Sequence, residues 1–312
     1  MHLIKKVNKM SSQSKTINFN PSEVLGITAA LLTVTIWAGY LASSRAGITS
    51  GLSGMDIAFI RISVSGLIMA PFALYQLFNK RINFRWIHIC VLTCLIGPPF
   101  VFISAGGYAY TPLAHGAIIT PAFFTIGGLI FARYLLNDTV SNQAKIGVGL
   151  IFTGLLLVAG AAFFEFSPIF LIGDIMFVIG GLMWALTASL QKKWNLQPMD
   201  IASFVSVLGA VVFIPYYLAT HSLEPINNLS SEMLWFLIIV QGVLSGVVAL
   251  IAFTKAVVLL GAARASLFPT LVPAIAILIG IPITGEIPDN FQWAGLCIVT
   301  TGLVIAVIGS RK

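Results

Sequence analysis

A single arginine, Arg61, lies inside a long apolar stretch of the sequence. If that stretch crosses a membrane, the charge costs on the order of 3 kcal/mol, so a functional or paired role is the first expectation. The planar guanidinium group of an arginine suits a carboxylate or a phosphate. The alternative is structural, with the long side chain reaching back to the membrane interface. Both interpretations of Arg61 remain open from the sequence.

Two tryptophans, Trp37 and Trp184, lie at matching positions 147 residues apart, near the middle of two other apolar stretches. Tryptophan gathers at membrane interfaces, but these two lie too deep for that role. We expect them to line a central cavity; packing between helices is the alternative. Tyr40 follows Trp37 by one helical turn, so it shares the same helix face and would add a hydroxyl group.

Gln241 lies in the middle of a further apolar stretch, beside Gly242 and Gly246. A buried amide must find hydrogen-bond partners in hydrocarbon. Glycines spaced four apart let a neighbouring helix come close. Gln241 is therefore expected either to hold helices together or to hydrogen-bond a substrate.

Further candidates are a tyrosine, a histidine and three prolines. Tyr108 and His115 flank a short connection between apolar stretches. His115 is of the type that titrates near neutral pH and would couple transport to protons, although a solvated interface histidine is the commoner case. Pro121, Pro269 and Pro273 interrupt apolar stretches and are hinge candidates, with inherited packing as the alternative.

Motifs for other chemistry are missing from the sequence. The cysteines Cys90, Cys94 and Cys297 lie in apolar segments without a nearby cluster of histidines and carboxylates, so we expect no metal and no cofactor. No GxxxxGK[ST] motif occurs, which excludes ATP hydrolysis by this chain. The acids lie mostly at the ends of apolar stretches and the histidines are scattered, so no set of catalytic groups converges. We therefore expect that the protein is not an enzyme; a membrane-embedded lipid-modifying enzyme is an alternative.

The composition determines which elements must position these residues. The chain is 58% hydrophobic and 9% charged, with a mean hydropathy of +0.99. Soluble domains carry about 25% charged residues, so this is an all-α integral membrane protein. We predict a polar tail over 1–22, with no removable signal peptide, and ten transmembrane helices. The predicted helices span about 23–44, 55–78, 86–108, 112–135, 143–163, 170–191, 200–220, 231–254, 263–285 and 290–310.

The distribution of basic residues predicts the orientation. With a cytoplasmic N-terminus, nearly all of the 17 lysines and arginines fall on the cytoplasmic side; Arg45 falls on the outer side and Arg61 within a span. Because cytoplasmic loops are enriched in these residues, we expect both termini in the cytoplasm and a multi-pass protein of the cytoplasmic (inner) membrane. The basic residues behind the net charge of +7 therefore determine the orientation in the membrane, and we expect no nucleic-acid partner.

The two halves of the sequence, 23–163 and 170–310, repeat one another. The segment MDIA occurs at 55–58 and again at 199–202. Near the end of each half, Pro121, Asp138, Gly147 and Gly154 recur at an offset of 148 as Pro269, Glu286, Gly295 and Gly302. Five spans per half force the second copy to be inverted, a design typical of secondary transporters.

The motifs resemble those of the drug/metabolite transporter superfamily, and specifically of EamA-type transporters. The similar features are residues 36–39 (IWAG) leading to 56–61 (DIAFIR), and, near the end of each half, an acidic residue, a glutamine and a glycine-bearing helix. The first half has Ala144 where the family has tryptophan after glutamine, and the second half has no arginine matching Arg61. The resemblance implies a 5+5 inverted bundle whose central cavity is lined by helices other than the fifth and tenth.

The function expected from the repeat and the resemblance is secondary-active transport. The substrate would be a small organic metabolite, amino acid-like or drug-like, exported through the lipid bilayer by alternating access. A non-transporting membrane scaffold or subunit is the other alternative. Convergence of Trp37, Arg61, Trp184 and Gln241 on one cavity would favour the transporter.

Overall fold

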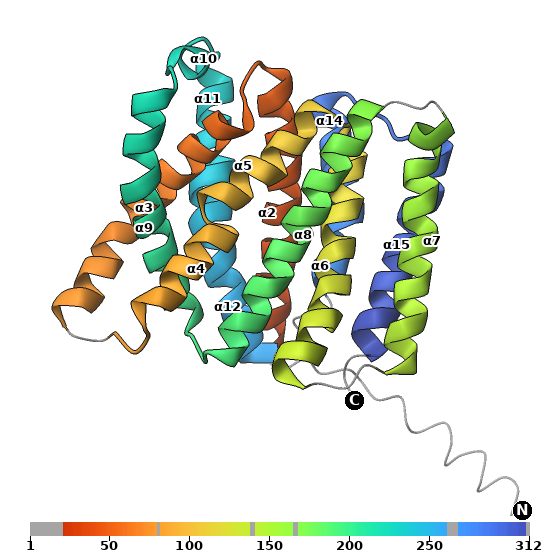
Figure 1. Ribbon diagram of the computed structural model, residues 1–312, viewed down its shortest axis with the longest axis horizontal. Coiled ribbons are helices and arrows are strands. Elements are labelled where there is room, and N and C mark those ends of the chain that lie inside the picture. The colour runs from red at the N-terminus through yellow and green to blue at the C-terminus, as the bar shows by residue number, and fades with distance from the viewer. Residues whose placement is uncertain (1–20, 80–81, 138–140, 165–167, 261–267, 310–312) are drawn as a thin grey trace, which may run out of the picture.

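A computed structural model describes residues 21–79, 82–137, 141–164, 168–260 and 268–309. These residues form a bundle of helices that run up and down between the same two ends, and no strand occurs among them (Figure 1). The chain is a multi-pass membrane protein, as its composition predicts. In Figure 1, α2 begins and α15 ends at the same end of the bundle.

Helical elements of the first half follow the predicted order of apolar stretches. They are α2 (Pro21–Thr49), α3 (Gly54–Phe78), α4 (Trp86–Ile96), α5 (Pro98–Gly106), η1 (Gly107–Ala109), α6 (Leu113–Leu136) and α7 (Asn142–Phe164). Those of the second half are α8 (Pro168–Lys193), α9 (Pro198–Thr220), α10 (Glu224–Asn227), α11 (Ser231–Leu237), η2 (Ile238–Val248), α12 (Ala249–Leu260), η3 (Phe268–Leu271), α14 (Val272–Thr284) and α15 (Asn290–Gly309).

Seven helical segments within the described ranges are long and apolar enough to cross a membrane. They correspond to the predicted spans one to four and six to eight. The fifth, ninth and tenth predicted spans correspond to shorter apolar segments: Asn142–Leu157 within α7, Phe268–Thr284 over η3 and α14, and Asn290–Ala306 within α15.

The third and eighth predicted spans are not regular α-helices, a feature that our sequence analysis did not predict. The third breaks at Gly97, between α4 and α5, because the two prolines that follow lack the N–H groups that would continue the helix. The eighth changes to π-helical geometry in η2, where the hydrogen bonds run one residue further along the chain. Gly97 and η2 lie at corresponding positions of the two repeats.

Helices α3 and α9 pack side by side in antiparallel directions. Asp56, in the first turn of α3, accepts a hydrogen bond from the hydroxyl of Tyr217 near the end of α9. At the other end of the pair, the amide of Gln76 donates to Asp200 in the first turn of α9, at 2.6 Å. The two aspartates are the repeated residues of the MDIA segments. In each repeat, the same aspartate therefore accepts a hydrogen bond from a side chain of the other repeat.

The crossing point of α3 and α9 uses a second repeat-related pair. A side chain on Gly66 would collide with the Cβ of Ala210 and with the carbonyl oxygen of Ser206, 3.2 Å away. Gly66 and Ala210 are separated by 144 residues, as the MDIA segments are. Residues related by a two-fold rotation can touch one another only close to its axis. The α3–α9 crossing therefore lies close to a local two-fold axis.

Helices α7 and α15 form a second antiparallel pair, at one edge of the bundle (Figure 1). A Cβ on Gly147 would lie 2.6 Å from the carbonyl oxygen of Gly302, and one on Gly154 would lie 2.9 Å from that of Gly295. These four glycines are the repeated ones. Their small size lets the two backbones approach closely, as small residues do at membrane helix interfaces.

The predicted hinge prolines occupy different settings. Pro121 lies inside α6. Pro269 lies in the 3₁₀ turn η3, and Pro273 lies in the first turn of α14, where proline is well tolerated. Of these three prolines, Pro121 alone therefore lies in the interior of a continuous helix.

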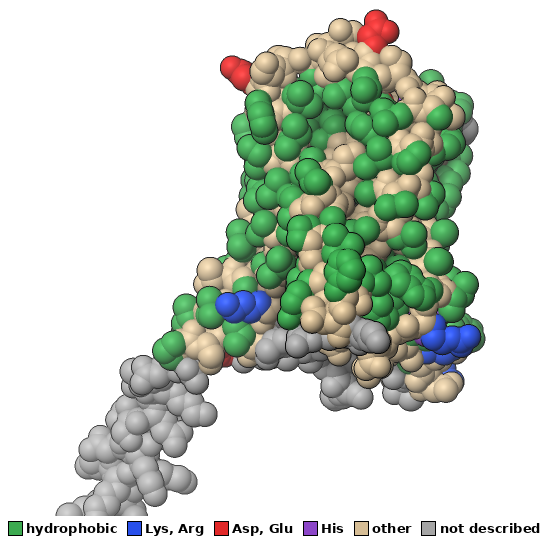
Figure 2. Space-filling view, turned by 90° about the vertical axis from the view of Figure 1, so that its left-hand side faces the viewer, with side chains coloured by type: hydrophobic (Ala, Val, Ile, Leu, Met, Phe, Trp, Pro, Cys, Tyr) green, Lys and Arg blue, Asp and Glu red, His purple; other side chains and the backbone are tan. Residues whose placement is uncertain are grey.

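The outer surface agrees with a membrane environment. Figure 2 shows an apolar surface between an end with acidic side chains and an end with basic ones. The described basic residues of the second end are Arg85, Arg133, Lys145, Lys192, Lys193 and Lys255. We refer to these ends as the acidic end and the basic end.

Candidate functional site

A cavity of about 100 Å³ lies between the two halves of the chain. Its lining comes from α2, α3, α4, α5, α8, α9, η2 and α12, and none of it comes from α7 or α15. Gln191 near the end of α8 and Ile201 near the start of α9 belong to the lining, so the cavity extends from the middle of the bundle toward the basic end.

An aromatic wall bounds this cavity. The rings of Trp37 and Trp184 meet edge to face, with their centroids 6.4 Å apart. Phe100 extends the wall, with its ring centroid 6.2 Å from that of Trp184. All three residues line the cavity. The structure thus brings together the two tryptophans that the sequence places at matching positions.

Arg61 also lines the cavity. Its Nη1 donates a hydrogen bond of 2.9 Å to the hydroxyl of Ser245 in η2, and its guanidinium carbon lies 4.7 Å from the centre of the Tyr40 ring. This contact between a cation and an aromatic face is favourable and strengthens away from water. The Arg61 side chain is thus held within the bundle between α2 and η2.

Tyr40, whose ring packs against the guanidinium group of Arg61, is itself held in place. The Tyr40 side chain is buried, and its hydroxyl lies 2.7 Å from the hydroxyl of Ser104 in α5. A fixed ring keeps the guanidinium group in place, so the contribution of Tyr40 is to position Arg61. Ser104 and Ser245 are functional candidates that our sequence analysis missed, since serines in apolar segments are too common to be a signal.

Gln241 lies next to the cavity but does not line it. Its side chain is fully buried, and its Nε2 lies within hydrogen-bond distance of the Tyr40 carbonyl (3.1 Å) and of the hydroxyls of Ser43 and Ser44 (both 2.9 Å). These contacts join η2 to α2. Of the two roles considered for Gln241, the geometry therefore favours holding helices together.

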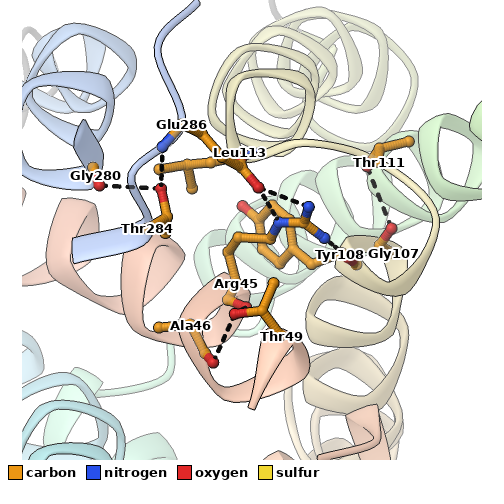
Figure 3. Close-up of polar contacts among 10 residues, drawn as sticks. All are labelled: Arg45, Ala46, Thr49, Gly107, Tyr108, Thr111, Leu113, Gly280, Thr284 and Glu286. Carbon is orange, nitrogen blue, oxygen red and sulfur yellow. Dashed lines mark hydrogen bonds and ion pairs between the residues drawn. The ribbon is translucent and has the colours of Figure 1, made fainter. Parts of the chain in front are cut away.

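At the acidic end, an ion pair joins the two halves of the chain (Figure 3). Arg45 at the end of α2 lies 2.6 Å from the Glu286 carboxylate, which follows α14. The same carboxylate accepts a hydrogen bond of 2.8 Å from the backbone N–H of Leu113, the first residue of α6. Arg45 also donates to the backbone carbonyl of Tyr108 in η1.

These four residues, Arg45, Glu286, Leu113 and Tyr108, are called here the outer cluster; their contacts join α2, η1, α6 and the segment after α14 at the acidic end of the bundle. A carboxylate at the start of a helix satisfies N–H groups that have no partner within the helix. Glu286 thus anchors α6 and neutralises Arg45 at the same time. In the sequence, Arg45 served to assign the orientation and Glu286 to identify the repeat; their pairing had no signal, because the two residues are too far apart along the chain.

Tyr108 and His115 are both buried, with 1% and 2% of their surface exposed. The Tyr108 ring packs against Phe177, with a centroid distance of 4.8 Å. His115 lies in the first turn of α6, and its Nδ1 is 2.8 Å from a carboxylate oxygen of Asp174 in α8. The interpretation of His115 as a solvated interface residue is therefore wrong.

Metal-binding geometry is not found in the described part of the chain, where no group of three or more His, Cys, Asp and Glu side chains comes together. Cys90, Cys94 and Cys297 are free cysteines on the surface of the bundle.

Comparison with known proteins gives matches over nearly the whole chain. The profile of the EamA-like transporter family matches residues 24–160 and again residues 171–308. An uncharacterized transporter of Archaeoglobus fulgidus is 25% identical over 293 residues, which cover 88% of this chain and 94% of the relative. The uncharacterized inner membrane transporter YedA of Escherichia coli is 22% identical over 280 residues, 88% of each chain.

A similar fold occurs among solved structures. One crystal structure superimposes with a TM-score of 0.62 at 13% identity, and the match covers 93% of this chain and 98% of that one. At this identity the likeness concerns the fold alone.

Proposed function

Since this chain belongs to the EamA-like transporter family, we propose that it is a secondary-active transporter that exports a small organic metabolite, amino acid-like or drug-like, across the cytoplasmic membrane. The observation that carries the proposal is the cavity between the two halves. Arg61 and the paired rings of Trp37 and Trp184 face that cavity, and such a site near the bilayer midplane is typical of carriers built from repeats.

The proposed topology is ten spans in two inverted sets of five, with both termini in the cytoplasm. The antiparallel pairs α3–α9 and α7–α15 support the inversion, because each pair joins corresponding helices of the two repeats. The proposal counts the three shorter apolar segments as spans, in addition to the seven longer ones. The basic end faces the cytoplasm by the distribution of lysine and arginine.

Alternating access in this protein would then begin from a state that is closed at the outside. The outer cluster and the buried Tyr108 ring lie at the acidic end, whereas the cavity extends toward the basic end. Opening to the outside requires the Arg45–Glu286 ion pair to separate. The breaks at Gly97 and in η2, together with Pro121 in α6, are among the places where helices can bend.

The driving force that we propose is a proton gradient. The buried His115 contacts the partly exposed carboxylate of Asp174, and the two residues lie on α6 and α8, which pack against each other from different repeats. Histidine is the side-chain type most often used to exchange protons, and this contact lies at an interface along which the two repeats would move against each other.

Transport by purified protein in lipid vesicles tests the proposal. A growth-inhibition screen with and without overexpression, across amino acids, analogues, bases and toxic cations, would first select the substrate class. Flux of the selected compound should then fall in Trp37→Ala and Trp184→Ala. The matched control is Trp235→Ala, since Trp235 is 62% exposed on the outside of α11. Vesicles that move none of the compounds faster than empty vesicles would favour the scaffold alternative.

A further inference from the structure

Arg61 has no acidic partner among the residues that the structure describes. The ion pairs Arg45–Glu286 and His115–Asp174 do not involve Arg61. Asp56, the acid closest to it along α3, is already bound to Tyr217. A guanidinium group in a membrane interior with only a hydroxyl and an aromatic face as partners lacks the anion that would compensate its charge.

The Arg61 guanidinium group lines the cavity and retains donors beyond the one bound to Ser245. Nη1 is used by Ser245 and one face of the group is covered by Tyr40. An arginine carries five N–H donors in a planar fork, and two of them can bind both oxygens of a carboxylate at once. Ser245 and Tyr40 hold the fork in place, so little rotamer entropy is lost when an anion binds.

The rest of the cavity lining contains no charge. Among the described residues, its remaining polar side chains are the serines Ser65 and Ser206, besides Ser245, and the amide Gln191. An ammonium group would find hydroxyls and aromatic faces here but no carboxylate. A cation would in addition be repelled by Arg61.

We propose that the cavity selects organic anions: a carboxylate of the ligand binds the Arg61 fork, and its apolar part lies against Trp37 and Trp184. This inference rests on the proposed function and narrows the substrate to compounds for which the carboxylate is required and an ammonium group is not. Arg61 has no counterpart in the second repeat, so the anion binds on one side of the local two-fold axis.

Binding of three ligands of similar shape to the purified protein tests the proposal. The probes are 3-phenylpropanoate, 3-phenylpropanamide and 3-phenylpropylamine, which place an anion, a neutral amide or a cation on the same phenyl group. Affinities are measured by calorimetry in lipid nanodiscs. The carboxylate should bind about tenfold or more tightly than the amide, as expected for a charge-assisted pair, and the amine should bind most weakly.

Variants then assign the preference to one side chain. Arg61→Gln should remove the preference for the carboxylate, and Arg61→Lys should restore part of it, because charge remains but the fork is lost. Arg133→Gln, an equal change at the exposed end of α6, should leave it unchanged. Thermal unfolding of each variant checks that it is folded.

Two results would overturn the inference: equal or tighter binding of the amine or the amide, or no binding of the carboxylate. A preference that persists in folded Arg61→Gln would equally overturn it. These results are distinct from failure of the proposed function. Flux of a cation would support the proposed transport function and contradict the selection of anions. Carboxylate binding without flux of any compound would support the anion site and contradict the transport function.

Discussion

Trp37 and Trp184 are separated by 147 residues in the sequence, and their rings touch in the middle of the bundle, with centroids 6.4 Å apart. They are corresponding residues of the two repeats, as are Gly66 and Ala210, which also touch. Corresponding residues can meet only near the axis that relates the repeats. The cavity lined by the two tryptophans therefore lies close to this axis, where the rearrangement of one repeat against the other that we propose would change access to it.

The first prediction concerns the aromatic wall. Trp184→Phe should retain most of the flux of the substrate selected by the growth screen, because a ring still closes the cavity. Trp184→Ala should lower that flux about tenfold, since a lost aromatic contact costs on the order of 1.5 kcal/mol. Radiolabelled efflux from vesicles measures both. Equal flux in the two variants would assign Trp184 to packing alone.

A second prediction concerns the outer cluster. In a background where Cys90, Cys94 and Cys297 are replaced by alanine, Ser206→Cys places a thiol in the cavity lining. A membrane-impermeant maleimide added outside should label it slowly. Arg45→Gln should increase that labelling several-fold, because breaking the ion pair with Glu286 favours the state open to the outside.

The control and the reciprocal test of the outer cluster use the same assay. Glu232→Gln changes an exposed acid of α11 and should leave labelling slow. Exchange of the two charges, Arg45→Glu with Glu286→Arg, should restore the ion pair and bring the labelling rate part of the way back to that of the unchanged protein. Labelling that does not respond to Arg45→Gln would show that the ion pair does not hold the outer end closed.

The third prediction concerns the α7–α15 contact. Gly147→Ala should lower stability by about 1 to 3 kcal/mol, because its Cβ would overlap the backbone of α15. Gly149→Ala is the matched control two residues away, where a Cβ meets nothing within 4 Å. Thermal unfolding in detergent compares the two. A similar melting temperature for both variants would contradict the close packing of these helices.

The fourth prediction tests proton coupling through His115 and Asp174. Efflux from vesicles with an acidic exterior should exceed efflux without a gradient, because proton entry would drive export. His115→Gln should abolish this stimulation while leaving exchange of substrate between the two sides measurable. His221→Gln, a change at the exposed end of α9, serves as the control. Stimulation that survives in His115→Gln would assign the coupling elsewhere.

Membership of the EamA-like transporter family and the helical membrane architecture could be predicted from the sequence and are confirmed. Apolar length and charge at the ends of helices are local properties, so each segment reports them without its neighbours. The break at Gly97 also had a local signal, the two prolines that follow it, which our sequence analysis did not use. The π-helical geometry of η2 had no such signal; in the folded bundle its glycines Gly242 and Gly246 pack against α3.

Tertiary structure alone decided which polar residues meet. Arg45 and Glu286 are separated by 241 residues, and Arg61 and Ser245 by 184. Spacing in the sequence contains no information on contacts between helices at such separations. Packing likewise decided that Gln241 holds α2 rather than facing the cavity, and that His115 is buried against Asp174. The sequence by itself determined the helices and their repeat; the folded bundle determined which side chains form the cavity and which form the ion-pair cluster at the acidic end.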